Sequence, residues 1–365
     1  MYRSAVYIVI LLLAALFFCS CSDNAASLDD DDMRIADVTL LVTPAGLGDN
    51  GYNDCAAEGV FAFAYHTNTP LSIMQPSDAD DAEYAYKKWL DDNAGRDSAV
   101  LIMGSSMYET ILLRHAAEDK ERLLAMQKRG CRILLFESNL QIDGVTTVYI
   151  SRYGISWLAG AMSKDFDALV YAASEGYSSL EESILGFTDA RKTYKGEKNG
   201  TPVQTELLYL ADGEDSFAMP DSAYRMMSRR GKQGMMTYDE MIFPLLGGSV
   251  LGLIRYLNDE ELTAALMIGM DVDMTGLSSR IPFSMVIRID KVLNQYLDDW
   301  YAGRDWQPAR RFGMQDGVTD IVFTQGFNEH LVMSDGRYDE PGTFPNLYNT
   351  YKEEAIRKEA EYENR

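Results

Sequence analysis

The sequence predicts an α/β protein of two lobes, each built on a parallel sheet, with a ligand cleft between them. Three observations lead to this prediction. Short apolar runs alternate with amphipathic segments, the alternation restarts near Leu169, and 47% of the 365 residues are hydrophobic, which is enough for two cores. Strands that alternate with helices form parallel sheets through right-handed crossovers.

The first predicted lobe consists of apolar strands separated by segments with apolar residues at helical spacing. Its strands are expected at Val38–Thr43, Ala99–Met103, Arg132–Phe136 and Thr146–Ile150. Its helices are expected at Ala56–His66, from Ile111 to Met126 and at Ile155–Met162. We therefore assign residues 35–152 and about 284–312 to this lobe. The helix at Ile155–Met162 comes after residue 152 and so falls within the range of the second lobe.

The second predicted lobe repeats the pattern and comprises residues 153–283 and about 313–345. Its elements are expected as strands at Leu169–Ala173, Leu207–Leu210, Met241–Phe243 and Ala264–Ile268, and as a helix at Leu180–Lys192. An amphipathic helix from Ile287 to Tyr301 returns the chain to the first lobe. Residues 346–365 alternate acids and bases at helical spacing, which predicts a charged, solvated C-terminal helix.

The first residues predict export and a lipid anchor. Arg3 precedes an apolar run from Ala5 to Phe18 that is too short to span a bilayer, as in a signal peptide of residues 1–20. Ser20 precedes Cys21, the pattern of bacterial lipoprotein processing, so Cys21 is the expected lipidated residue; ordinary cleavage without a lipid is the alternative. Residues 21–34 are polar and acidic and form the expected tether. The body would lie on the periplasmic face or the cell surface.

Charge and composition exclude several classes of partner. The formal net charge of −23 argues against nucleic acid and anionic lipid headgroups, so the membrane contact would be the lipid anchor alone. The three histidines are not spaced as a metal cluster, and we expect neither a metal nor a cofactor. Cys55 and Cys131, expected at opposite ends of neighbouring strands, are predicted to be buried thiols. A monomer is expected.

Ligands of parallel α/β sheets bind beyond the carboxyl ends of the strands, so the loops after the predicted strands are the candidate site. The loop Gly46–Asn53 follows the first strand, and its glycines allow a ligand to approach the backbone while Tyr52 offers a face for stacking. Alternatively, this loop is a turn in which Asp49 or Asn53 caps the next helix.

Four segments occur in one order that resembles the basic membrane lipoprotein family, the purine-nucleoside-binding lipoproteins of ABC transporters. They are Gly48–Asn53, Gly247–Ser249, Gly269–Asp273 and Ser284–Asp290. The resemblance extends from Asp37 to about Phe327. It implies the type I periplasmic-binding-protein fold, with two Rossmann-like lobes and a nucleoside held between them.

The resemblance also implies a set of ligand-binding residues. Tyr52 would stack on the base, Asn53 would bond its edge, and Asp271 would hold ribose hydroxyls. Gly247 and Gly248 would bring backbone amides to the sugar. The further candidates in the same loops are Asp49, Asn50, Ser105 and Glu109, of which Glu109 stands where the family has an aspartate.

Phe187 is a further candidate, and two positions, Ile287 and the loop at Ser105, depart from the family's pattern. Phe187 is the candidate for an opposing aromatic ring, although helices carry core phenylalanines at this spacing. Ile287 stands where the family has a lysine that reaches the ribose, and the loop at Ser105 lacks the family's phenylalanine. A modified nucleoside or another small sugar-bearing molecule therefore remains an alternative.

The predicted function is that of a solute-binding lipoprotein of an ABC-type uptake system, with a nucleoside-like ligand and an ABC permease as partner. The alternative is a ligand-sensing or surface-exposed binding lipoprotein with no transporter. Asp49, Glu109 and Asp271 could also converge for acid and base chemistry. No nucleophile elbow and no serine, histidine and acid set at recognisable spacing accompanies them, so we do not expect an enzyme.

Overall fold

The computed structural model describes residues 37–49, 51–104, 106–198, 200–233, 240–259, 265–307, 309–324 and 343–364. The chain divides into two compact units, Met1–Ile35 and Ala36–Arg365, and the described residues belong to the second. The predicted signal peptide, the tether with Cys21, and the candidates Asn50 and Ser105 lie outside the described residues.

A six-stranded parallel sheet forms the first half of the body, with strand order β14-β5-β4-β3-β1-β2. Its strands are β1 (Val38–Leu41), β2 (Leu71–Met74), β3 (Val100–Gly104), β4 (Arg132–Phe136), β5 (Thr146–Ile150) and β14 (Ala309–Phe312). Strands β1, β3 and β5 are buried along their whole length, as expected for a sheet covered on both faces.

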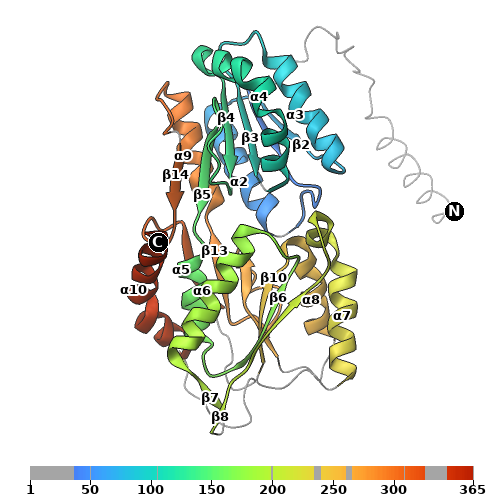
Figure 1. Cartoon of the computed structure of the whole chain (residues 1–365), viewed down its shortest axis with the longest axis vertical. Helices are drawn as coiled ribbons and strands as arrows, with labels where there is room; N and C mark the ends of the chain where they lie inside the picture. The colour runs from blue at the N-terminus through green and yellow to red at the C-terminus, as the bar shows by residue number, and fades with distance from the viewer. Residues whose placement is uncertain are drawn as a thin grey trace, which may run out of the picture. The chain divides into compact units, whose positions relative to one another are not determined.

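Four helices cover this sheet, two on each face (Figure 1). Helices α2 (Tyr52–Thr67) and α9 (Ile289–Tyr301) pack together on one face and form the first core with it. Helices α3 (Ala79–Asn93) and α4 (Ser106–Arg129) cover the other face. The side chain of Asp78 accepts a hydrogen bond from Asp81 N over 2.9 Å, which caps the start of α3.

The second half of the body is built on two further sheets. One is parallel, with order β11-β10-β6-β9; the other has the order β12-β13-β15, with β15 antiparallel. The strands are β6 (Asp167–Ala172), β9 (Thr205–Tyr209), β10 (Glu240–Leu245), β11 (Leu266–Met267), β12 (Gly269–Asp271), β13 (Phe283–Ile287) and β15 (Thr319–Phe323). A separate hairpin pairs β7 (Glu197–Lys198) with β8 (Thr201–Pro202).

Helices flank the parallel strands of this half on both sides (Figure 1). They are α5 (Tyr153–Met162), α6 (Ser178–Tyr194), α7 (Pro220–Lys232) and α8 (Val250–Asp259), with short 3-10 turns η2 (Glu214–Ala218) and η3 (Gly247–Ser249). Helix α5 is buried along its whole length. Gly160 lets α5 approach α6 closely, because a Cβ there would collide with the backbone oxygen of Phe187. The buried residues of this half form the second core.

The C-terminal helix α10 (Thr343–Glu363) packs on α5, as Figure 1 shows. Ala355 and Glu359 are buried in this contact, and the ring of Tyr362 stacks on that of Tyr153 with centroids 4.3 Å apart and an interplanar angle of 3°. The helix is therefore solvated along one side, while its other side packs on α5. Its apolar stripe is narrow, and only the contact with α5 reveals which side is buried.

The chain passes between the two cores in segments that are hydrogen-bonded to one another. Ser151 N donates to Phe312 O over 2.7 Å, and Arg288 N donates to Val318 O over 2.8 Å. Strand β13 contributes Phe283 to the second core and ends in the first core at Ile287. The helix predicted from Ile287 therefore begins at Ile289, after this strand.

Two buried carboxylates, those of Glu182 and Glu359, accept hydrogen bonds from the segments that run between the cores. Glu182 Oε1 accepts hydrogen bonds from Tyr153 N at 3.2 Å and Arg311 Nη2 at 3.0 Å, and Glu359 Oε1 accepts one from Met314 N at 2.8 Å. Burial raises the pKa of each carboxyl to about 7, against the opposing effect of these donors. Both groups thus join segments of the chain that run between the cores.

The two cysteines predicted to be buried thiols lie within the described residues. Cys55 and Cys131 are buried free thiols, although Cys55 lies in α2 and not at a strand end. In the described ranges, no group of three or more His, Cys, Asp or Glu side chains is arranged to hold a metal ion. None of the helices in these ranges combines the length and apolar character needed to cross a bilayer.

Candidate ligand-binding pocket

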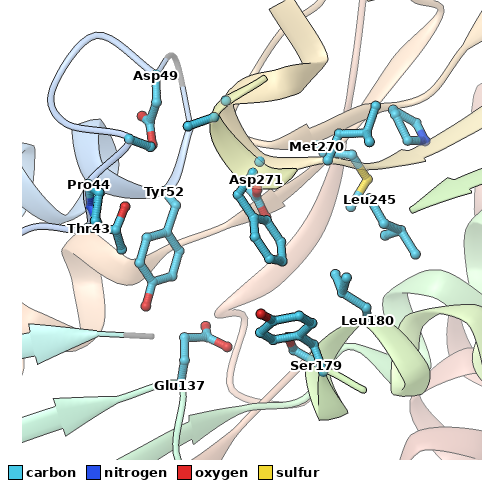
Figure 2. Close-up of a pocket in the computed structure, with 18 of the residues that line it drawn as sticks. Thr43, Pro44, Asp49, Tyr52, Glu137, Ser179, Leu180, Leu245, Met270 and Asp271 are labelled. Atoms are coloured by element: carbon cyan, nitrogen blue, oxygen red, sulfur yellow. The ribbon is translucent and has the colours of Figure 1, made fainter. Parts of the chain in front are cut away.

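One pocket is lined by the segments that follow the carboxyl ends of strands in both cores (Figure 2). Its empty volume, which includes the open solvent at its mouth, is about 1170 Å³. The charged, aromatic and glycine residues in its lining are Asp49, Tyr52, Glu109, Glu137, Arg152, Tyr177, Asp215, Phe217, Gly247, Gly248 and Asp271. This is where the doubly wound α/β architecture places ligands.

Asp49 both lines the pocket and caps helix α2. Its Oδ1 accepts a hydrogen bond from Gly51 N at 2.9 Å, and its Oδ2 accepts one from Asn53 N at 3.0 Å. Burial raises the pKa of Asp49, while these backbone donors act in the opposite direction. Asp49 therefore caps the helix, as the turn interpretation of this loop predicted, and it also lines the pocket.

Asn53 holds the loop and does not line the pocket. Its Oδ1 accepts from Thr43 N at 3.0 Å, and its Nδ2 donates to Thr43 Oγ1 and Gly46 O, each at 2.9 Å. The side chain is buried, and its amide is occupied by these bonds. The structure thus gives Asn53 a loop-fixing position where the resemblance implied contact with a base.

Tyr52 faces the pocket from the first turn of α2 (Figure 2). Its ring stacks on Phe136 with centroids 5.2 Å apart and an interplanar angle of 25°. Gly104, the last residue of β3, provides the space: a Cβ there would collide with both the Tyr52 hydroxyl and the Phe136 ring. The glycine that ends β3 therefore determines where the Tyr52 ring can lie.

Glu137, Arg152 and Asp271 form a charged group in the pocket wall. Arg152 Nη1 lies 2.8 Å from Glu137 Oε2, and Arg152 Nη2 lies 3.8 Å from Asp271 Oδ1. Burial raises the pKa of both carboxyls, and the Arg152 guanidinium opposes that rise. One guanidinium is thus shared between two carboxylates in a poorly solvated place.

Glu137 and Asp271 also share an unfavourable backbone conformation. Each has a φ of +65°, in the left-handed region that side-chain-bearing residues rarely adopt. Glu137 directly follows β4, and Asp271 is the last residue of β12. Such conformations cost about 1–3 kcal/mol and cluster at functional sites, where the surrounding structure holds them. The strain here aims two carboxylates at one pocket.

The second core contributes aromatic rings and a glycine turn. Tyr177 precedes α6 and Phe217 lies in η2, and their rings meet edge to face with centroids 5.1 Å apart. Ser249 Oγ accepts a hydrogen bond from Met219 N at 2.6 Å and donates one to Ser216 O at 2.7 Å, so it fixes the residues on both sides of Phe217.

The turn Gly247–Ser249 approaches the loop of the first core closely. Gly247 has a φ of +52°, and Gly247 and Gly248 both line the pocket. A Cβ added to Gly248 would lie 3.5 Å from the Asp49 Cβ and 3.9 Å from the Ala45 Cβ. A Cβ at Gly248 would thus be in ordinary van der Waals contact with the first core's loop, so the turn and that loop lie about one side chain apart beside the pocket.

Phe187 is not brought to the pocket. Its side chain is fully buried in the second core and stacks on Phe243 with centroids 4.4 Å apart. The aromatic side chains that the second core presents to the pocket are Tyr177 and Phe217. Phe187 lies on the side of α6 that faces the sheet, where apolar rings at helical spacing are ordinary core residues.

The remaining predicted positions divide between pocket and core. Glu109 is in the first turn of α4, half-buried, and lines the pocket. Ile287, at the family's lysine position, is buried in the first core. Among the described lining residues the one cation is Arg152. Arg152 reaches the pocket from the start of α5, whereas Ile287 ends β13. The positive charge in the pocket therefore does not come from the position of the family's lysine.

Sequence reasoning missed Glu137, Arg152, Tyr177 and Phe217. Glu137 and Arg152 follow strands predicted at Arg132–Phe136 and Thr146–Ile150, so the rule of carboxyl ends could have found both. Tyr177 follows the strand predicted at Leu169–Ala173 and was open to the same rule. Phe217 lies in a short 3-10 turn that no periodicity marks.

Comparison with known proteins identifies the fold. No protein-family model matches the chain, and the comparison with curated proteins finds no match. A solved solute-binding protein of an ABC transporter system from Aeropyrum pernix K1 is similar, with a TM-score of 0.64, 16% identity and 89% of each chain covered. A solute-binding protein from Burkholderia graminis C4D1M in complex with D-arabinose has a TM-score of 0.54 and 12% identity, covering 80% of this chain and 97% of that chain.

Regulators of transcription share the same architecture. A transcriptional activator of the comK gene from Bacillus halodurans has a TM-score of 0.57 and 15% identity, covering 86% of this chain and 97% of that chain. At these identities the likeness establishes the fold alone. The predicted class is confirmed: the chain is an α/β protein with the type I periplasmic-binding-protein fold.

Proposed function

We propose that the protein is the solute-binding component of an ABC-type uptake system and binds one small molecule in the pocket between its two cores. The observation that carries this proposal is the convergence of carboxylates and aromatic rings from both cores on one pocket. Asp49, Glu137 and Tyr52 come from the first half of the chain, whereas Phe217 and Asp271 come from the second. A ligand that contacts both sets would hold the cores together.

A sugar-bearing ligand such as a purine nucleoside fits the residue types. Carboxylates accept pairs of hydrogen bonds from adjacent sugar hydroxyls, and aromatic rings contact the apolar face of a sugar or base. The resemblance to the nucleoside-binding lipoproteins supports this choice through Tyr52 and Asp271. The arabinose-bound solute-binding protein with the same fold supports it independently at the level of a sugar.

We further propose that the two cores act as lobes with the boundaries given by the sequence, residues 35–152 with 284–312 and residues 153–283 with 313–345. Hinge motion would take place where the chain passes between them, at Ser151, Arg288 and Gly313. The turn at Gly247 and Gly248 supports this proposal, because it lies beside the Asp49 loop of the other core at the pocket.

A lipid anchor at Cys21 would keep the protein at the membrane surface, close to a permease. A sensor that uses the same closure without a transporter is the second candidate. It is favoured by a specific observation, the shared fold of the Bacillus halodurans transcriptional activator. We do not propose an enzyme, because Asp49 acts as a helix cap, Glu137 and Asp271 are engaged with Arg152, and the described lining pairs no nucleophile with a general base.

The test is a thermal-shift screen of the protein against purine nucleosides, free bases, pentoses and hexoses. A ligand that binds only the folded state must raise the melting temperature, and the rise grows with the logarithm of the ligand concentration once this exceeds the dissociation constant. We expect a rise with at least one of the sugar-bearing compounds. A screen in which none of these classes shifts the melting temperature would contradict the proposal.

A further inference from the structure

The pocket carries an excess of negative charge. Its described lining contains one guanidinium, from Arg152, and five carboxyl side chains, from Asp49, Glu109, Glu137, Asp215 and Asp271. Asp215 is exposed at the edge, but Glu137 and Asp49 are buried. A neutral sugar can be bound by one or two carboxylates, so this number needs a separate explanation.

The guanidinium does not offset this excess, because it is already paired. Arg152 contacts Glu137 at 2.8 Å and Asp271 at 3.8 Å, which leaves that group of three with a net negative charge. Its remaining lining neighbours are carboxyl, aromatic, apolar or hydroxyl side chains. An anionic ligand would therefore meet repulsion from five carboxyl side chains, and the one cation is already shared between two of them.

One carboxylate oxygen in the pocket wall has an unused position. The side chain of Glu137 is only 6% exposed, and while its Oε2 accepts from Arg152, its Oε1 has no hydrogen-bond partner among the described residues. Figure 2 shows the Glu137 carboxyl directed into the pocket on the side to which the Tyr52 hydroxyl points. This oxygen is itself shielded from solvent, so a ligand's N–H or O–H would reach it through a small shift of the pocket wall. A buried carboxylate oxygen without a donor costs free energy that such a bond would recover.

Aromatic faces accompany the carboxylates. Tyr177 and Phe217 meet edge to face in the pocket wall, and Tyr52 lies on the side of the first core. The negative faces of aromatic rings attract cations, and recognition of ammonium groups combines such rings with carboxylates. The same rings would contact a neutral ligand, so they agree with a cation without requiring one.

We infer that the ligand carries a protonated nitrogen, as in an amino sugar or an amino-substituted nucleoside, and that Glu137 and Asp271 bind this group. The inference rests on the proposed function, because it specifies the charge of the solute that the pocket takes up. A cation in this place would neutralise carboxylates that water solvates poorly, which a neutral solute cannot do. Phosphorylated and carboxylated solutes would be rejected.

Burial also raises the pKa of Asp49, Glu137 and Asp271, each through poor solvation of the charged form. This is the behaviour expected of carboxylates whose counter-charge arrives with a ligand. A bound ammonium group would favour their ionised forms again, and the ion pair would then be shielded from salt by the closed pocket.

The experiment compares matched ligands that differ only in charge, by titration calorimetry at pH 6.5. Glucosamine, glucose and glucuronate form one set, and 5′-amino-5′-deoxyadenosine, adenosine and adenosine 5′-monophosphate form another. In the set that binds, we expect the amine to bind at least about tenfold more tightly than the neutral compound, and the acid not to bind. Glu137→Gln should reduce that preference to below about threefold, whatever its effect on the affinity for the neutral compound.

The outcomes separate this inference from the proposed function. A neutral compound that binds as tightly as its amine would overturn the inference and leave the proposed function intact. A complete absence of binding in both sets would overturn the two together. Asp271→Asn provides a second variant if Glu137→Gln does not fold, and Asp273→Asn, an exposed residue outside the pocket lining, should keep the full preference.

Discussion

Arg152 Nη1 donates a hydrogen bond of 2.8 Å to Glu137 Oε2, joining the start of α5 to the residue that follows β4. Both side chains are largely buried. A pair of this kind contributes little compared with an apolar replacement, but removal of one partner leaves a buried charge alone. Removal of either partner of this ion pair should therefore lower the stability of the protein markedly.

The first prediction is that Arg152→Met lowers the free energy of unfolding by about 3–5 kcal/mol. The double variant with Glu137→Gln should recover part of that loss, because one of the stranded charges is removed. Equilibrium urea denaturation measures both. Arg288→Met is the matched control, since the exposed Arg288 pairs with Asp290 at 2.6 Å and an exposed pair contributes about 1 kcal/mol or less. Equal losses for both arginine variants would contradict the account.

The second prediction concerns the space that Gly104 leaves for Tyr52. Gly104→Ala places a methyl group against the Tyr52 hydroxyl and the Phe136 ring, so we expect a loss of about 1–3 kcal/mol in stability and a weaker response to ligand. Gly95→Ala is the control, because a Cβ there meets nothing within 4 Å, and its effect should stay within about 0.5 kcal/mol. Identical melting temperatures for the two variants would show that Tyr52 is not confined in this way.

The third prediction follows from the two carboxyls between the cores. Burial raises the pKa of Glu182 and of Glu359 to about 7, above the ordinary value of 4.5 that applies to the unfolded chain. Between these values the folded protein holds protons that the unfolded chain has released, so stability falls as the pH rises from about 5 to about 8. Each group contributes up to roughly 3 kcal/mol to this fall, at about 1.4 kcal/mol per pH unit.

Denaturation at pH 5 and pH 8 measures this dependence. Glu182→Gln keeps an oxygen acceptor for Tyr153 N and removes the titrating group, so the difference between the two pH values should shrink. The variant should also gain stability relative to the wild type at pH 8. A wild-type protein that becomes more stable toward pH 8, or a variant with an unchanged pH dependence, would refute the assignment.

The fourth prediction tests how Phe217 is positioned. Ser249→Ala removes the acceptor for Met219 N and the donor to Ser216 O, which are buried or part-buried, so stability should fall by about 1–3 kcal/mol. Ligand affinity should fall as well, because η2 loses its connection to the glycine turn. Ser222→Ala, which removes an exposed hydrogen bond to Arg225, should change neither quantity. Retained affinity in Ser249→Ala would mean that Phe217 is held by other contacts.

The sequence predicts the fold best where strands are buried on both faces. The predicted strands Arg132–Phe136 and Thr146–Ile150 agree with β4 and β5 to the residue, because both are short segments rich in β-branched, aromatic and apolar residues. Strand β2 was missed because its residues are only half-buried at the sheet edge. Helix α3 was missed because acidic residues dilute the spacing of Tyr86, Trp89 and Leu90, which are buried.

The limits at the pocket have a different physical origin. Loops at strand ends could be located from the sequence, and they do bring Asp49, Tyr52, Glu109 and Asp271 to one pocket. Hydrogen-bond partners are set by tertiary structure, so the engagement of Asn53 with its own loop was hidden. The choice between pocket and core for an aromatic residue on a helix likewise depends on which face meets the sheet.

The central claim is that the pocket between the two cores binds a small solute through Asp271. The most direct measurement is titration calorimetry of the wild type, Asp271→Asn and Asp273→Asn with the compound that gives the largest thermal shift. Asparagine tolerates the left-handed backbone conformation of residue 271, so the variant should fold. We expect Asp271→Asn to weaken binding at least about tenfold and Asp273→Asn to bind like the wild type. Equal affinities for all three proteins would contradict this claim.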